Sequence, residues 1–101
     1  LDALISPTMP LPTALLSELH QPRRDMDIGE TPMISYIHHT FSANLGGQPA
    51  ISAPCGFSSA GLPIGYQLMG RPFDEAMLFR IAWAYEQAHD WHQRQPTHVY
   101  D

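Results

Sequence analysis

The chain has 101 residues, a formal net charge of -5 and 44% hydrophobic residues, enough for one small domain. Its five basic residues are all arginine, and an acidic chain without clustered Lys and Arg is poorly suited to a nucleic acid backbone. No apolar run approaches the roughly 20 residues that span a bilayer, and the single cysteine, Cys55, excludes an internal disulfide. We therefore expect a globular, cytoplasmic protein without a nucleic acid or membrane partner.

The first half of the chain predicts a strand, a loop and a helix. Residues 3–6 form a short apolar run that ends at Pro7, and residues 11–30 have the weak periodicity of a loop, with one helical turn expected over 14–19. Because the sequence opens within this apolar run, we interpret it as a fragment whose upstream part is absent. Thr31-Pro32 is a helix start, and the predicted helix over 32–45 ends at Gly46-Gly47. Its apolar residues share one face: Ile34, Ile37, Phe41 and Leu45.

The second half predicts a hairpin followed by a helix. Residues 51–57 and 64–69 read as antiparallel strands, and Pro54 indicates a sheet edge or a bulge. Asp74 is the expected N-cap of a helix that runs to about His89, and Phe73 and Leu78 are spaced as a hydrophobic staple. The predicted inner face comprises Leu78, Ile81, Ala82, Tyr85 and Ala88. Phe79 and Trp83 fall on the other side, so this helix is apolar nearly all round and is expected to have partners on both sides.

Several side chains invite a chemical interpretation, and each also has a structural one. Cys55 is a possible nucleophile, but within an apolar strand we interpret it as a small hydrophobe. Asp74-Glu75 resembles an acid-base pair, although a helix N-terminus is sufficient reason for carboxylates there. The other candidates are two histidine pairs and three serines: His38 with His39, His89 with His92, and Ser52, Ser58 and Ser59. The histidines lack further zinc ligands at a suitable spacing, and no lysine is present to activate a serine, so we predict no catalytic residue, metal or cofactor.

Residues 44–75, beginning Asn-Leu-Gly-Gly-Gln-Pro-Ala-Ile-Ser-Ala-Pro-Cys-Gly-Phe, resemble the C-terminal end of an amidase signature family enzyme. The resemblance extends upstream to Ile-Ser-Pro-Thr-Met-Pro at 5–10, and downstream to Ala-Tyr-Glu-Gln at 84–87 and Trp-His at 91–92. It implies an α+β fragment of the amidase signature α/β fold, a β-hairpin with flanking helices that forms the C-terminal part of a large mixed sheet. Residues 1–101 would be one C-terminal segment whose partner is the remainder of the amidase chain.

In that family a nucleophilic serine, a second serine and a lysine upstream cut amide bonds. The resemblance therefore implies a chain that contributes strands and pocket walls to an amidase but is inactive alone. Its candidate substrate-binding residues are Ile37, His38 and Phe41, with core packing as the alternative for Ile37 and Phe41. The A subunits of amidotransferases commonly carry an acidic residue seven positions before the Asn of the Asn-Leu motif, and Ile37 stands there, which favours a general amidase.

Two other functions are open on the sequence alone. The first is a stand-alone, non-enzymatic α+β module that buries its unpartnered apolar faces in a homo-oligomer. The second is a small metal-binding domain built on the histidines, which ranks far lower.

Overall fold

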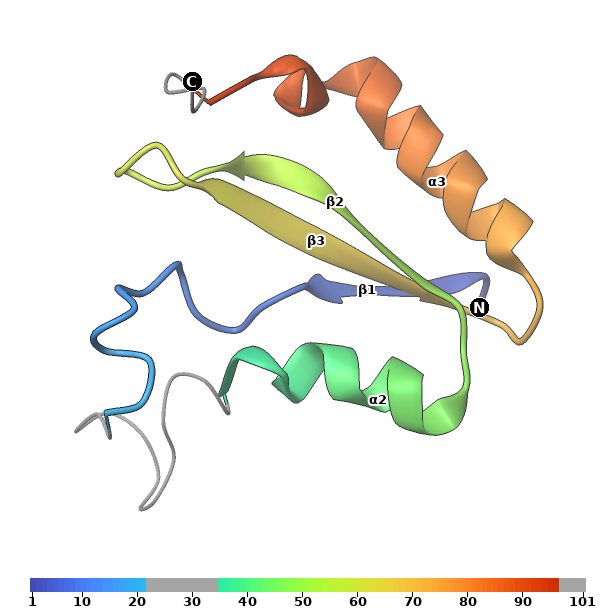
Figure 1. Cartoon of the computed structure of the whole chain (residues 1–101). Helices are drawn as coiled ribbons and strands as arrows, with labels where there is room; N and C mark the ends of the chain where they lie inside the picture. Colours follow the sequence, from blue (N-terminus) through green and yellow to red (C-terminus); the bar gives the residue numbers. More distant parts are fainter. Residues whose placement is uncertain (22–34, 97–101) are drawn as a thin grey trace.

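The computed structural model describes residues 1–21 and 35–96 as a three-stranded antiparallel sheet with one helix on each face (Figure 1). In chain order the elements are β1 (Ala3–Pro7), α2 (His38–Gly46), β2 (Ala50–Phe57), β3 (Pro63–Gly70), α3 (Glu75–Ala88) and a short 3-10 helix, η1 (Trp91–Gln93). This is an α+β unit, as the sequence predicted. The predicted helix start at Thr31-Pro32, Ile34 and residues 22–30 of the predicted loop lie outside the described residues. None of the helices in the described part is both long enough and apolar enough to cross a membrane.

Strand β3 lies in the centre of the sheet, between β1 and β2. The hairpin of β2 and β3 confirms the sequence prediction, and its register shifts between Pro54 and Gly56, so Cys55 sits in a bulge. Proline is compatible with this place because β2 is an edge strand and a bulge already interrupts the ladder. The prediction of an edge or a bulge at Pro54 is thus confirmed in both forms.

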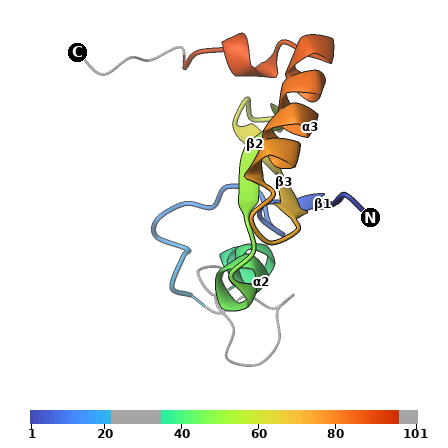
Figure 2. The ribbon, with the colours of Figure 1, turned by 90° about the vertical axis from the view of Figure 1, so that its right-hand side faces the viewer.

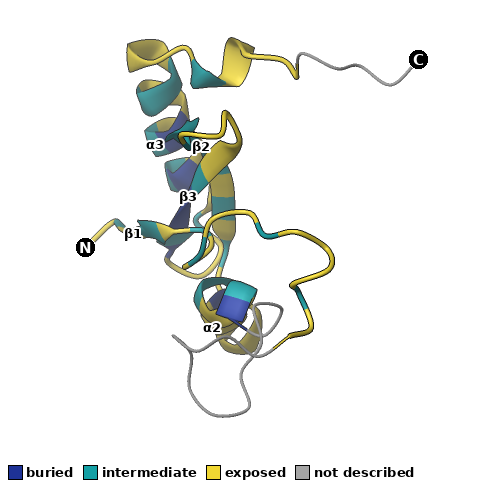
Figure 3. Ribbon diagram, turned by 90° about the vertical axis from the view of Figure 1, so that its left-hand side faces the viewer, coloured by how far each residue is buried: buried dark blue, intermediate teal, exposed yellow. Residues whose placement is uncertain are grey.

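The core lies between the sheet and α3, which runs along β2 and β3 (Figure 2). Its buried side chains are Tyr66 and Leu68 from β3 and Leu78 and Ala82 from α3. Ile81 and Tyr85 pack against them, so the predicted inner face of α3 is correct except for Ala88, which is exposed. Phe79 and Trp83 are more than 60% exposed on the other side of α3, so the expected partner on that side is not found within the described residues. Figure 3 shows both buried and exposed residues along α3.

The start of α3 corrects one prediction. Asp74 is the N-cap residue, but its side chain makes no capping hydrogen bond. Phe73 has a left-handed backbone (φ 63°) and is 95% exposed, so it does not staple the helix to Leu78. The turn aims the Phe73 ring away from the sheet, and Gly70 rather than Phe73 lies against Leu78.

Helix α2 ends as predicted, with Gly47 at the C-cap in the left-handed conformation (φ 66°), which glycine adopts without a steric penalty. The apolar face of this helix, however, is not buried. Ile37, Phe41 and Leu45 are 52%, 55% and 77% exposed, and the buried residue of the helix is Ala43. Within the described residues, Ile37 and Phe41 therefore do not pack into the core. Ahead of α2, residues 16–20 form consecutive turns rather than the predicted helical turn.

Candidate functional site

Two hydroxyl groups meet across the sheet on the face that carries α2. The Oγ1 atom of Thr8, just after β1, lies 2.6 Å from the Oγ atom of Ser52 in β2. The residue between them is Gly65 in β3, where an added Cβ would lie 3.0 Å from the Thr8 hydroxyl and 3.2 Å from that of Ser52. Glycine therefore leaves the room in which the two outer strands bond to each other over the central one.

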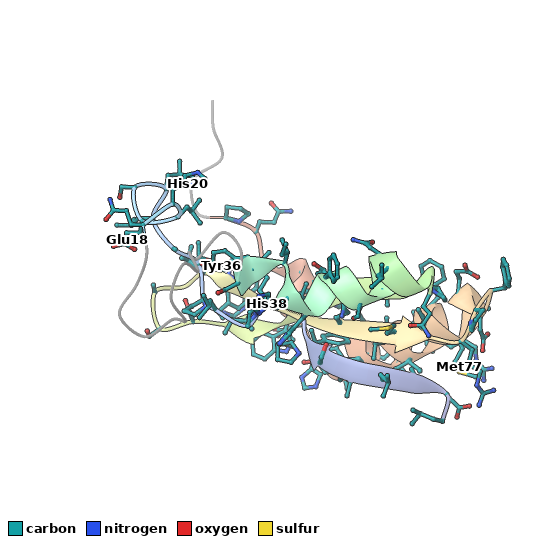
Figure 4. All side chains as sticks on the ribbon, turned by 90° about the horizontal axis from the view of Figure 1, so that it is seen from below. Glu18, His20, Tyr36, His38 and Met77 are labelled. Atoms are coloured by element: carbon teal, nitrogen blue, oxygen red, sulfur yellow. The ribbon has the colours of Figure 1, made fainter. Side chains whose placement is uncertain are left out.

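A cavity of about 600 Å³ opens beside this hydroxyl pair. The segment after β1 forms one wall, and the facing ends of β2 and β3 form the other. Besides Thr8, Ser52 and Gly65, its lining is Met9, Pro10, Leu11, Pro12, Thr13, Ala53, Pro54, Pro63 and Ile64. The Tyr36 hydroxyl donates a hydrogen bond to the Pro12 carbonyl and so ties this wall to the chain ahead of α2 (Figure 4).

The described lining of this cavity offers groups suited to binding a small molecule. Its described lining is apolar apart from hydroxyl groups and contains no titratable side chain, so no described group there can act as a general base. Ser52 has a hydroxyl rather than a base as its neighbour. Apolar walls with a few hydroxyl groups are typical of a site that holds the uncharged part of a small molecule.

The three predicted substrate-binding residues lie along the first turns of α2, away from the hydroxyl pair. His38 lines a separate groove of about 320 Å³ between α2 and β1, together with Leu4, Ile5 and Ser42 (Figure 4). Ile37 and Phe41 lie on the exposed side of the helix. The described part of the chain does not bring these three side chains into one closed pocket, and their role in substrate binding stays a prediction.

Helix α2 is held to the sheet by polar contacts. The buried amide of Gln67 in β3 donates to the His39 carbonyl at 2.8 Å. The His39 Nδ1 atom lies 2.9 Å from the Pro7 carbonyl, and because a carbonyl only accepts, Nδ1 carries the proton. These two bonds fix the orientation of α2 on the sheet and leave its apolar side uncovered.

The other chemical candidates have structural surroundings. The Ser58 hydroxyl accepts a hydrogen bond from the Leu62 amide within the hairpin loop, and Ser59 lies in the same turn. Cys55 is half-buried in the bulge, and its carbonyl accepts a long hydrogen bond of 3.5 Å from the Tyr85 hydroxyl. Within residues 1–21 and 35–96, no three His, Cys, Asp or Glu side chains are placed to hold a metal ion.

Sequence reasoning missed a row of rings that attaches the C-terminal segment to the hairpin. Tyr66, Tyr85, His89 and Trp91 follow one another with centroid separations of 4.9, 4.4 and 6.0 Å. The Arg94 guanidinium then lies 5.2 Å from the centroid of Trp91. The spacing of Tyr85 and His89 by one helical turn was the available signal, but the stacking of Trp91 depends on where the chain leaves α3.

Within the described residues two buried side-chain polar atoms lack a hydrogen-bond partner, the Tyr66 hydroxyl and Trp91 Nε1. Tyr66 itself is only 6% exposed. Burial is the main cause that raises the pKa of Tyr66 above its ordinary value, and the neighbouring Tyr85, Glu86 and Cys55 act in the same direction. The phenol is therefore held in its neutral form.

Comparison with known proteins gives a consistent family assignment. The family model described as Amidase matches residues 1–79. The A subunit of the glutamyl-tRNA(Gln) amidotransferase from Myxococcus xanthus is 48% identical over 95 residues, which cover 92% of this chain and 18% of the relative. Proteins of the same name from Thermodesulfovibrio yellowstonii and Methanosarcina barkeri are 42% and 41% identical, over 94% and 97% of this chain. The chain thus spans less than a fifth of the length of these relatives.

Proposed function

Because this chain belongs to the amidase family, we propose that it forms the C-terminal part of an amidase that hydrolyses a carboxylic amide to an acid and ammonia or an amine. The observation that carries the proposal is the family match together with the lack of any lysine in the sequence. The upstream part of the enzyme would supply the serine nucleophile, the second serine and the lysine that activates them. We place this enzyme in the cytoplasm.

In this proposal the chain contributes structure and pocket walls. The hydroxyl-lined cavity and the exposed Ile37, His38 and Phe41 on α2 are the two surfaces offered to a substrate. The second surface favours a substrate with an apolar portion, because Ile37 stands where the A subunits of amidotransferases commonly carry an acidic residue. An isoleucine side chain cannot accept a hydrogen bond from the ammonium group of glutamine.

A specific observation favours a second candidate function. The similar relatives named above are all A subunits of glutamyl-tRNA(Gln) amidotransferases, at 41 to 48% identity. If this chain is part of such a protein, the parent enzyme uses an amide donor to modify a charged tRNA, and contacts with glutamine must come from residues other than Ile37.

The decisive experiment measures ammonia release by the complete protein from its native host, with butyramide and glutamine as alternative substrates. Preferential use of butyramide supports a general amidase, and preferential use of glutamine supports the amidotransferase. Hydrolysis by the 101-residue chain alone would refute the proposal, because this chain contains no lysine.

A matched pair of variants tests the part assigned to Ile37. In the complete protein, Ile37→Asp should lower the KM for glutamine and raise that for butyramide, because the carboxylate can pair with an ammonium group. Ile37→Asn has almost the same shape but no charge, so it should reproduce the loss with butyramide without the gain with glutamine. If the two variants change both KM values equally, Ile37 does not contact the substrate.

A further inference from the structure

A second cavity lies where the segment after α3 folds over the end of the hairpin (Figure 1). Its volume is about 670 Å³, which is within the range of pockets that hold small molecules. Phe57, Leu62 and Pro63 line it from the hairpin, and Trp91 lines it from η1, which packs on β2. Leu62 is 42% exposed, so the cavity keeps an apolar surface that the described residues leave uncovered.

The Arg94 side chain lies against both aromatic rings of this cavity. Its guanidinium carbon, Cζ, is 4.8 Å from the centroid of Phe57 and 5.2 Å from that of Trp91. Both distances are within the roughly 6 Å over which a cation is attracted to the face of a ring. A guanidinium stacks through its flat face, whereas its N–H groups lie along its edge. The two rings therefore hold Arg94 in place without using its hydrogen-bond donors.

These donors have no acceptor in the described structure. Within residues 1–21 and 35–96, no carboxylate forms an ion pair with Arg94. Arg71 shows the more usual arrangement, because its guanidinium donates to the Leu1 carbonyl and to the Asp2 carboxylate. Arg94 thus presents an oriented set of donors that a planar acceptor can fill.

The lining of this cavity is suited to a negative charge. Its polar side chains are His92, Arg94 and Gln95, each of which can donate a hydrogen bond, and none of its described lining residues is acidic. A carboxylate matches the edge of a guanidinium with two parallel hydrogen bonds. Arg94 is the only side chain of the described lining with a permanent positive charge, which favours an anion with a single charge.

We propose that this cavity binds a small monocarboxylic acid with an apolar body. The carboxylate accepts hydrogen bonds from Arg94, and the apolar part lies against Leu62, Pro54 and Pro63. Such a site is an addition to the proposed function, because amide hydrolysis does not require it. Pro54 and Pro63 also line the cavity beside Thr8 and Ser52, so the two cavities share part of their lining.

Isothermal titration calorimetry of the 101-residue chain near neutral pH tests the class of ligand. Benzoate is the monocarboxylate, benzyl alcohol has a similar shape without a charge, and inorganic phosphate is an anion without an apolar body. We expect benzoate to bind at least about tenfold more tightly than either, because only benzoate combines charge-assisted hydrogen bonds with apolar contact. Equal affinities for benzoate and benzyl alcohol, tighter binding of phosphate, or no binding of benzoate would overturn the proposal.

Variants of Arg94 test whether this side chain holds the carboxylate. Arg94→Gln removes the positive charge, and we expect its affinity for benzoate to fall by about tenfold or more. Arg94→Lys keeps the charge but loses the paired donors, so its affinity should lie between the two. Arg80→Gln is the matched control, because it removes an exposed arginine of α3 that does not line this cavity. If Arg94→Gln and Arg80→Gln bind benzoate equally, and circular dichroism shows both folded, the assignment to Arg94 is wrong.

Nuclear magnetic resonance gives a readout on the wild-type chain that needs no variant. In the isotope-labelled chain, the side-chain Nε–H signal of Arg94 should shift when benzoate is added. The corresponding signal of Arg71, whose Nε already donates to the Leu1 carbonyl, should stay in place. A shift at Arg71 with none at Arg94 would contradict the proposed site.

The complete protein from its native host distinguishes a free acid from a group of the parent chain. Benzoate should bind the complete protein with the same dependence on Arg94. If benzoate binds the 101-residue chain but not the complete protein, another part of the protein fills the cavity there, and the proposed ligand is wrong. Ammonia release from butyramide or glutamine reports on the amidase alone, so the acid site and the proposed function fail separately.

Discussion

Gly70 at the end of β3 sets how closely α3 approaches the sheet. A Cβ atom at this position would lie 3.0 Å from Leu78 Cδ2 and 3.1 Å from Leu78 Cγ. Leu78 is only 2% exposed, so its side chain has no open space to move into. The backbone of Gly70 does not have positive φ, and the strain of Gly70→Ala is therefore one of packing. Overpacking of this size destabilises a core by about 1 to 3 kcal/mol.

A double-mutant cycle shows whether that contact is the cause. Leu78→Ala alone should lower the free energy of unfolding by about 2 to 5 kcal/mol, because it leaves a cavity in the core. In the Leu78→Ala background the new methyl group of Gly70→Ala has room, so this second change should be neutral or stabilising. The coupling between the two sites is then about 1 to 3 kcal/mol.

The assay is urea unfolding of the 101-residue chain, followed by circular dichroism. The free energies of unfolding of the variants are compared where the dependence of that free energy on urea concentration is the same. Gly46→Ala is the control, because Gly46 lies in α2 and an added Cβ there meets only the side chain of Gln48, at 3.4 Å or more. It should stabilise the chain by up to about 1 kcal/mol. A Gly70→Ala variant as stable as wild type, or one whose effect is unchanged by Leu78→Ala, would show that the spacing of α3 is not set at Gly70.

Three further sets of variants probe the polar and aromatic contacts. Thr8→Val and Ser52→Ala should each lower the free energy of unfolding by about 0.5 to 1.5 kcal/mol. The double variant should lose less than the sum of the two, because neither hydroxyl is then left without its partner. Strictly additive losses would contradict the pairing of the two hydroxyl groups. Tyr66→Phe should be at least as stable as wild type, because the hydroxyl has no partner to lose. The pKa of the Tyr66 hydroxyl is raised in the folded chain, so above about pH 10 the unfolded chain loses the hydroxyl proton first. The stability of wild type therefore falls as pH rises through the folded pKa. In thermal unfolding measured over a pH series, Tyr66→Phe should lose less stability than wild type, and an equal loss with pH in both would contradict this reasoning. Arg94→Ala should destabilise the packing around Trp91 by about 0.5 to 1 kcal/mol, whereas Arg94→Lys should retain part of the stabilisation. If the unfolding curve of Arg94→Ala, followed by tryptophan fluorescence, is the same as that of wild type, the contact is refuted.

Local sequence signals predicted the secondary structure well because the determining interactions are local. Gly47 ends α2 since only glycine adopts its backbone conformation without a penalty, and Pro54 marks an edge strand since it cannot donate to a ladder. The staple at Phe73 failed for the opposite reason. Its spacing from Leu78 was suitable, but the turn between β3 and α3 decides where the ring points, and that depends on how α3 docks.

The candidate site was less predictable because it depends on contacts between distant segments. Thr8 and Ser52 are 44 residues apart, and nothing in the sequence indicates that their hydroxyl groups meet over Gly65. The periodicity of α2 predicts that its apolar residues share one face of the helix, but it does not determine what covers that face. In the described chain Ile37 and Phe41 are exposed, so the pattern that normally marks a core face marks an uncovered one here.

The two helices are held by different forces, and this difference bears on their roles. Helix α3 is fixed by buried apolar side chains, with Leu78 and Ala82 in the core. Helix α2 is fixed by hydrogen bonds, from Gln67 to the His39 carbonyl and from the His39 ring to the Pro7 carbonyl. Hydrogen bonds to backbone carbonyls are directional, so they set the orientation of α2 without using its apolar face. Ile37 and Phe41 are thereby left exposed on a helix whose orientation on the sheet is fixed.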